Sequence, residues 1–91
     1  MIRGFRNKGL EELFDKGRSR RVGADLQSRA LRRLDALAHA ATLRDLNVPG
    51  FDFHPLRGKP QRYSLHLNGP WCITFEWDEG DARQVDLEQY H

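Results

Sequence analysis

The sequence predicts an α+β fold in which two N-terminal helices pack on one face of a small antiparallel β-sheet. The last third of the chain alternates apolar and polar residues through three runs separated by turn residues, as half-buried antiparallel strands do. The first half instead repeats apolar residues at helical spacing. Because a sheet with one apolar face must cover it, the helices are the expected cover.

Residues 1–23 are expected to form an extended piece followed by a short helix. Residues 2–6 are expected to add a strand to one side of the sheet. Asn7 can cap the helix, because its side-chain oxygen accepts a bond from a free backbone N–H. Gly17 is expected to end it in the left-handed conformation that is common just past a helix. The apolar stripe of this helix consists of Leu10, Leu13 and Phe14.

A second helix is predicted over residues 24–41. Arg29, Arg32 and Arg33 are expected to face away from its apolar stripe, either as a solvated surface or as a binding surface. The stripe itself consists of Leu26, Ala30, Leu34, Leu37, Ala38 and Ala41.

Thr42 and Asp45 have the spacing of a capping box for a single helical turn over residues 43–46. Residues 47–50 are expected to end that turn. Residues 51–60 contain proline and glycine and no helical pattern, so they are expected to approach the first hairpin strand as a rigid loop.

Three strands are predicted over residues 62–68, 71–77 and 82–88. Alternation assigns one apolar face to Tyr63, Leu65, Leu67, Trp71, Ile73, Phe75, Trp77, Val85 and Leu87. It assigns the opposite face, which we call the polar face, to Arg62, Ser64, His66, Asn68, Cys72, Thr74, Glu76, Gln84, Asp86 and Glu88.

The loop of the first hairpin is expected to contain three residues, 68–70. A two-residue loop at 68–69 would mix the two faces, because a slip of one residue flips every side chain. The three-residue loop pairs Leu67 with Trp71. The same register pairs Leu65 with Ile73, Tyr63 with Phe75, His66 with Cys72, Ser64 with Thr74, and Arg62 with Glu76.

The composition describes one small domain, residues 1–91, without a membrane span or a signal peptide. A single cysteine excludes an internal disulfide and is typical of a cytoplasmic protein. Residues 1–33 hold ten Lys and Arg against four Asp and Glu, whereas residues 34–91 hold five against nine. Twelve of the fifteen basic residues are arginine, which suits bidentate contacts with phosphate or carboxylate. The basic half therefore predicts either a polyanion or acidic protein partner, or only a solvated surface.

The segment 54–62 contains four basic or imidazole side chains and no acid: His54, Arg57, Lys59 and Arg62. Beside a polar sheet face, such a patch could hold a phosphodiester, with histidine carrying a proton and arginine binding the anion. The alternative is a surface loop of mixed use.

His66 opposite Cys72 suggests a metal half-site or a thiolate–imidazole pair. No third ligand is obvious in the sequence, so no metal site is predicted. Glu76, Asp86 and Glu88 could act as general bases, or they could simply solvate a strand face.

Several segments together resemble HigB-type toxins of the RelE-like superfamily. They are residues 2–14 (IRGFRNKGLEELF), 43–50 (LRDLNVPG), 54–58 (HPLRG), 71–75 (WCITF), 80–82 (GDA) and 90–91 (YH). The resemblance implies a bacterial toxin of a type II toxin–antitoxin system that cleaves mRNA on the ribosome and uses no metal or other cofactor. It implies a helix-turn-helix, HigA-like antitoxin as partner, with operator DNA contacted only indirectly through that antitoxin.

By the resemblance, Arg57, His91 and His54 occupy catalytic positions. Arg57 would bind the phosphate, His91 would exchange the proton, and His54 would assist or orient. The residues expected to bind RNA are Lys59, Arg62, His66 and Tyr90.

Two positions depart from the family pattern. Cys72 and Asn68 stand where relatives commonly or sometimes have arginine, and both are assigned to the polar face. The alternative hypothesis is therefore a catalytically weak or inactive relative that acts as an antitoxin-binding co-repressor.

Overall fold

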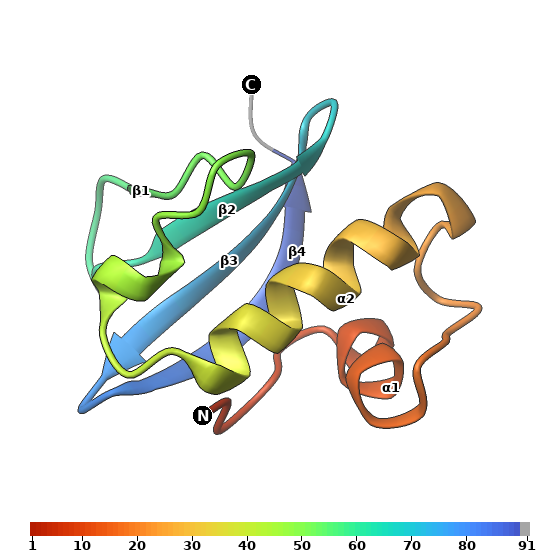
Figure 1. The fold of residues 1–91 in the computed structure, drawn as a ribbon, viewed down its shortest axis with the longest axis horizontal. Helices are drawn as coiled ribbons and strands as arrows, with labels where there is room; N and C mark the ends of the chain where they lie inside the picture. Colours follow the sequence, from red (N-terminus) through yellow and green to blue (C-terminus); the bar gives the residue numbers. More distant parts are fainter. Residues whose placement is uncertain (90–91) are drawn as a thin grey trace.

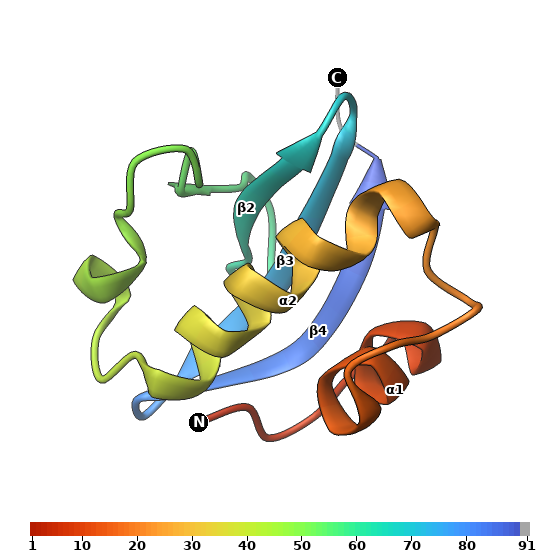
Figure 2. The ribbon, with the colours of Figure 1, turned by 45° about the vertical axis from the view of Figure 1, so that its right-hand side comes forward.

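The computed structural model describes residues 1–89, which form two α-helices, a short 3-10 helix and four strands. In chain order these are α1 (Lys8–Lys16), α2 (Ala24–His39), η1 (Leu43–Leu46), β1 (His54–Pro55), β2 (Tyr63–Asn68), β3 (Trp71–Asp78) and β4 (Asp81–Gln89). The strands form one antiparallel sheet in the order β1-β2-β3-β4. α2 lies across one face of this sheet and α1 lies at its β4 edge (Figure 1, Figure 2). The predicted α+β class is confirmed.

α1 begins and ends as predicted. The backbone N–H of Leu10 donates to Asn7 Oδ1 at 2.9 Å, and Gly17 has φ of 81°, in the left-handed region. Leu10 and Leu13 are fully buried. Phe14 was expected on the same stripe but is 37% exposed, because it lies at the margin and rests against the Phe5 ring.

α2 ends earlier than predicted, at His39, and Ala41 is exposed rather than part of the apolar stripe. The cause is the capping box of η1. Asp45 Oδ2 accepts the backbone N–H groups of Ala41 and Thr42 at 2.9 and 3.0 Å, which turns the chain away from the helix axis. The predicted capping box itself is confirmed.

Arg33 was expected to face away from the core, and this expectation is wrong. Its side chain is only 5% exposed and lies over the Phe51 ring at 4.6 Å. Its guanidinium donates to the carbonyls of His66 at 2.9 Å, Gly50 at 3.2 Å and Arg29 at 3.2 Å. Burial lowers the pKa of Arg33, and the charges of neighbouring arginines lower it further. The residue ties α2 to β2 and to the segment before β1.

The first hairpin has the predicted pairs Tyr63–Phe75, Ser64–Thr74, Leu65–Ile73 and His66–Cys72. Its loop differs, because Asn68 and not Leu67 pairs with Trp71. A bulge between His66 and Asn68 shortens the loop to Gly69 and Pro70 and still keeps the faces apart.

β4 also contains a bulge, between the pairs Thr74–Asp86 and Glu76–Arg83. Gln84 has φ of 50° at this point, so strict alternation fails and both Ala82 and Val85 are fully buried. Residues 1–6 run beside this part of β4, through isolated parallel bridges at Ile2–Ala82 and Phe5–Val85. The expected added strand is therefore present only as an extended segment with two bridges.

The core lies between α2 and the apolar face of the sheet. Its buried apolar members are Leu10, Leu13, Val22, Leu26, Ala30, Leu34, Leu37, Ala40, Leu46, Phe51, Leu65, Leu67, Ile73, Phe75, Ala82 and Val85. This arrangement confirms that the second helix covers the apolar face formed by Leu65, Ile73 and Phe75. Of its predicted stripe, Leu26, Ala30, Leu34 and Leu37 belong to this cluster, whereas Ala38 and Ala41 do not.

Candidate functional site

The centre of the polar face is buried, although the alternation of residues predicted one covered and one open face. Ser64 is 1% exposed, Thr74 is 0% exposed and Cys72 is also buried. β1 was not predicted, and it pairs His54 with Ser64 and Pro55 with Tyr63. His54 therefore lies on the same face as Ser64, with both ring nitrogens within 3.5 Å of the Ser64 hydroxyl, and Arg62 contacts Thr74 on this face.

His54 lies at the edge of the polar face with its side chain exposed and both ring nitrogens near polar atoms. Its Nδ1 lies 2.9 Å from the carbonyl oxygen of Asp52. Its Nε2 lies 3.2 Å from Ser64 Oγ, which is closer than the 3.5 Å between that oxygen and Nδ1. The position of the ring is thus set by a backbone carbonyl and a buried hydroxyl.

Arg62 crosses the polar face from the start of β2 towards β4, with its side chain only 14% exposed. Its Nη2 donates to Thr74 Oγ1 at 2.7 Å and to Glu88 Oε1 at 3.2 Å, and its Nη1 lies 3.7 Å from Glu76 Oε2. Thr74 Oγ1 donates to the same Glu88 oxygen at 2.6 Å. The positive charge of Arg62 is therefore neutralised by two acids, which are half-buried rather than fully solvated.

Arg57 and Lys59 occupy the loop between β1 and β2, and both are exposed. Within residues 1–89 neither side chain forms an ion pair. Arg57 and Lys59 could therefore bind a phosphate directly, whereas Arg62 is already paired with two acids. Asp86, the third acid assigned to the polar face, accepts the N–H of Leu87 at 2.8 Å and lies 3.9 Å from Arg6.

His66 and Cys72 are neighbours across β2 and β3, as predicted, but they do not form a thiolate–imidazole pair. His66 Nε2 donates to the carbonyl of Gly69 at 3.0 Å. Burial raises the pKa of the Cys72 thiol, and the nearby charges of Asp52 and Glu88 raise it further. The thiol is therefore less reactive than an ordinary cysteine. Within residues 1–89, no group of three or more His, Cys, Asp or Glu side chains is arranged to hold a metal ion.

Tyr90 and His91 lie outside the described residues, so their predicted roles stay predictions. Sequence reasoning placed Ser64 and Thr74 on the polar face but assigned them no role. The predicted register already paired Ser64 with Thr74 across β2 and β3, whereas the pairing of Ser64 with His54 depends on β1, which was not predicted.

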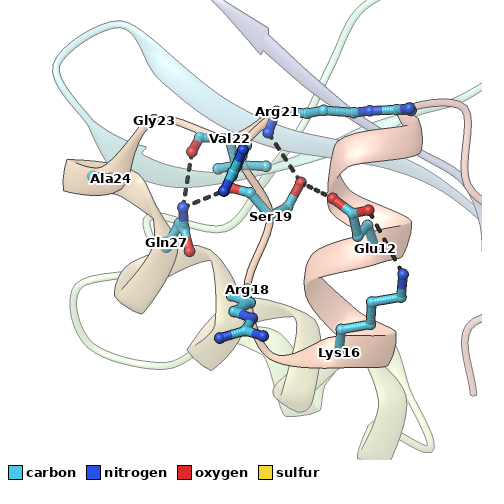
Figure 3. A pocket seen from close by; sticks show the side chains of 10 residues that line it. Glu12, Lys16, Arg18, Ser19, Arg21, Val22, Gly23, Ala24 and Gln27 are labelled. Atoms are coloured by element: carbon cyan, nitrogen blue, oxygen red, sulfur yellow. Dashed lines mark hydrogen bonds and ion pairs between the residues drawn. The ribbon is translucent and has the colours of Figure 1, made fainter.

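A second polar region is the basic connector, residues 17–23 between α1 and α2, which borders a hollow of about 920 Å³ together with residues at the facing ends of both helices (Figure 3). Ser19 is buried there, donating to Glu12 Oε1 at 2.6 Å and accepting the N–H of Arg21 at 3.1 Å. This hydrogen bond, together with the charges of Lys16 and Arg21, lowers the pKa of Glu12. Gln27 donates to the carbonyls of Ser19 and Val22 at 2.7 and 3.0 Å, so the connector is well braced. The basic side chains around the hollow are Lys16, Arg18, Arg20 and Arg21.

The fold and the polar face together describe a small α+β domain with a histidine at the edge of one sheet face and two exposed cations in the loop that follows it. A family model described as "RelE-like toxin of type II toxin-antitoxin system HigB" matches residues 3–91. The protein named Endoribonuclease HigB from Proteus vulgaris is 38% identical over 92 residues, which cover 100% of this chain and 100% of that protein. The chain therefore belongs to the HigB family of RelE-like toxins. Within residues 1–89 no helix has the length and apolarity to cross a membrane.

Proposed function

We propose that this toxin is a ribosome-dependent endoribonuclease that cleaves mRNA in the cytoplasm and thereby arrests translation. The observation that carries the proposal is the full-length similarity to a protein named as an endoribonuclease. The exposed side chains of His54 on the polar face and of Arg57 and Lys59 in the loop after it support the proposal, because an imidazole and two exposed cations are suited to a phosphodiester.

The proposed reaction is attack of a ribose 2′-oxygen on the adjacent phosphorus, without a metal ion. A base removes the 2′ proton as the O–P bond forms, and an acid donates a proton to the 5′-oxygen as its bond to phosphorus breaks. The products are a 2′,3′-cyclic phosphate and a free 5′-hydroxyl. Cations at the phosphate stabilise the extra negative charge of the transition state.

In this mechanism Arg57 binds the phosphate, His91 exchanges the proton and His54 assists or orients. Lys59, His66 and Tyr90 hold the RNA, the tyrosine by stacking on a base. Arg62 joins them only by exchanging Glu76 or Glu88 for a phosphate, since both acids contact it in the free protein.

The test is cleavage of a reporter mRNA on programmed ribosomes. Arg57→Ala is expected to lose on the order of a hundredfold or more in rate, as for removal of one transition-state donor. His91→Ala is expected to lose about 10²–10⁴-fold, the usual contribution of general acid–base catalysis. Cys72→Ala is the control and should cleave like wild type. An inactive Cys72→Ala beside an active Arg57→Ala would show that the site is misplaced.

Cys72→Arg sharpens this test, because it restores a cation where relatives commonly have one. Cys72 pairs with Glu88 across β3 and β4, so the new side chain has an acid beside it. Cleavage is expected to be equal to wild type or faster. A loss of cleavage with retained folding would mean that the position does not face the RNA.

A second candidate function is an antitoxin-binding co-repressor with weak or no nuclease activity. The pairing of Arg62 with Glu76 and Glu88 favours it, because these acids neutralise a cation on the proposed RNA face and themselves repel phosphate. Absence of cleavage by folded wild-type protein on programmed ribosomes would establish this alternative over the nuclease.

A type II toxin has a cognate antitoxin, and we propose a helix-turn-helix, HigA-like protein that alone contacts operator DNA. The basic connector is the proposed docking surface, because its exposed arginines surround a hollow large enough for acidic side chains. The other candidate surface is the exposed loop after β1 that carries Arg57.

Stopped-flow association at low and high salt distinguishes the two surfaces. Arg20→Glu should slow association, and salt should weaken the difference, because charge acts on encounter rates and is screened. Arg44→Glu, an exposed arginine on η1, is the matched control. Slow association of Arg57→Glu with normal association of Arg20→Glu would instead indicate that the antitoxin covers the loop around Arg57. An association rate that is insensitive to salt would exclude electrostatic docking at either surface.

A further inference from the structure

The buried side chain of Arg33 holds the chain ahead of β1 against β2. All three of its guanidinium nitrogens donate to carbonyl oxygens: Nε to His66 at 2.9 Å, Nη2 to Gly50 at 3.2 Å and Nη1 to Arg29 at 3.2 Å. Its guanidinium carbon also lies 4.6 Å from the centre of the Phe51 ring. Within residues 1–89 this cation forms no ion pair, so the carbonyls and the ring are what stabilise it in the interior.

Arg33 takes the place of a backbone donor that the neighbouring chain does not supply. In a hydrogen-bonded antiparallel pair, each residue donates its N–H to the other and accepts at its own carbonyl. The N–H of His66 donates to the carbonyl of Phe51 at 2.7 Å, but the N–H of Phe51 turns back to the carbonyl of Val48 at 3.0 Å. The carbonyl of His66 therefore receives no bond from Phe51, and Nε of Arg33 donates to it instead. The first contact between this segment and β2 thus depends on a side chain of α2.

His54 lies between this first contact and a later one. The N–H of Leu56 donates to the carbonyl of Arg62 at 2.8 Å, which fastens the far end of the segment to β2. Between the two contacts, Asp52 has φ of 47° and its carbonyl oxygen lies 2.9 Å from Nδ1 of His54. A left-handed residue other than glycine persists only where the surrounding structure holds it. Loss of Arg33 would release the segment on one side of Asp52 and leave it fastened on the other.

We propose that Arg33 is a positioning residue for the cleavage reaction, which acts through the segment ahead of β1 on the place of the His54 ring. The inference rests on the proposed nuclease function, because that function gives His54 a part in the reaction. Arg57 and Lys59 follow the later contact with β2, so their places depend less on Arg33. Removal of Arg33 should therefore affect the turnover of bound RNA more than the binding of RNA.

The first test is made on the free protein by NMR. Arg33→Met keeps a long side chain and removes the three donors, so the His66 amide should exchange faster relative to the amides of β3, and the imidazole shifts of His54 should change. Arg33→Lys keeps the charge with one nitrogen in place of three and should give intermediate values. Leu13→Ala is the matched control. It removes a fully buried side chain from α1, at the opposite edge of the sheet, and should leave the His54 shifts unchanged (Figure 1).

Cleavage on programmed ribosomes then tests whether the place of the ring matters. Arg33→Met is expected to lower kcat per folded molecule about tenfold to a hundredfold with KM nearly unchanged, because a displacement of about 1 Å can cost about a hundredfold. Arg33→Lys should recover part of the lost kcat. Leu13→Ala should lower the folded fraction, measured by circular dichroism, and keep the wild-type kcat per folded molecule. If Arg33→Met does not fold, Phe51→Leu removes the ring beside the guanidinium, keeps an apolar side chain and should change the His54 shifts and kcat in the same direction.

Unaltered His54 shifts in the folded variants of Arg33 and Phe51 overturn the inference. Altered shifts with a wild-type kcat per folded molecule overturn its catalytic half and leave standing that Arg33 holds the segment. If wild type itself does not cleave, the proposed function fails and the catalytic half fails with it. The amide exchange of His66 and the shifts of His54 still decide in that case whether Arg33 holds the segment.

Discussion

The two faces of β3 bury neighbouring residues by different means. Ile73 and Thr74 are adjacent in the chain and both are 0% exposed. Ile73 lies in the apolar cluster between the sheet and α2. Thr74 lies on the opposite face under Arg62, with its hydroxyl bonded to Arg62 and Glu88 at 2.7 and 2.6 Å.

The difference shows that apolar and polar burial place different requirements on the sequence. Apolar burial is non-directional, so many apolar covers of similar volume can stabilise the Ile73 face. Polar burial requires a partner at hydrogen-bond distance for each group, so the Thr74 face depends on particular residues. The apolar face should therefore respond to lost volume, and the polar face should respond to lost pairing.

The largest expected effect is on the apolar face. Ile73→Ala should lower the free energy of unfolding by about 2–5 kcal/mol, because it leaves a cavity in a fully buried position. Ile73→Val is the matched control and should cost only about 0.5–1.5 kcal/mol. Urea unfolding followed by circular dichroism measures both. A loss below about 1 kcal/mol for the alanine variant would contradict volume-dependent burial on this face.

A smaller effect is expected on the polar face. Arg62→Ala should cost about 1–3 kcal/mol, because it strips hydrogen bonds from Thr74 and Glu88 in a place with little water. Glu88→Gln and the double variant complete a thermodynamic cycle, in which contacting residues typically couple by about 0.5–3 kcal/mol. A coupling of zero would mean that the two side chains are independent in solution. The apolar and polar faces would then not differ in the way proposed.

The same comparison explains which features the sequence could predict. The helices, the capping box and most of the hairpin register follow from periodicity and from residues such as Asn7 and Asp45, whose effects are local. The bulges at Leu67 and Gln84 are not visible in an alternating pattern, because one extra residue leaves the pattern on each side intact. Alternation could assign Ser64 to the polar face but could not show that the His54 ring lies against its hydroxyl.

The contacts of individual arginines were the least predictable feature, because an arginine side chain is long enough to reach residues on several different elements. Arg33 and Arg62 could each be expected from the sequence to face solvent or RNA. In the structure, both side chains instead form hydrogen bonds within the folded chain. Arg57 remains exposed, as a phosphate-binding residue should be. The candidate site was thus predictable as a segment and a face, whereas the pairing of each cation depended on three-dimensional contacts.

The smallest expected effect concerns Cys72, which lies on the polar face like Thr74 but whose thiol forms no hydrogen bond within residues 1–89. Burial raises the pKa of its thiol, so the folded protein should react more slowly with a thiol reagent at neutral pH than the urea-unfolded chain does.

A raised pKa means that the contribution of this group to stability is complete below the ordinary thiol pKa. That contribution declines as the pH rises through the raised value, because the unfolded chain releases its proton first. Cys72→Ala should remove this alkaline decline while changing the free energy of unfolding at neutral pH by only about 1 kcal/mol, as for a small buried group. Equal thiol reactivity in the folded and unfolded chains would show instead that the polar face opens readily to solvent, and the contrast with the Ile73 face would then be one of exposure rather than of pairing.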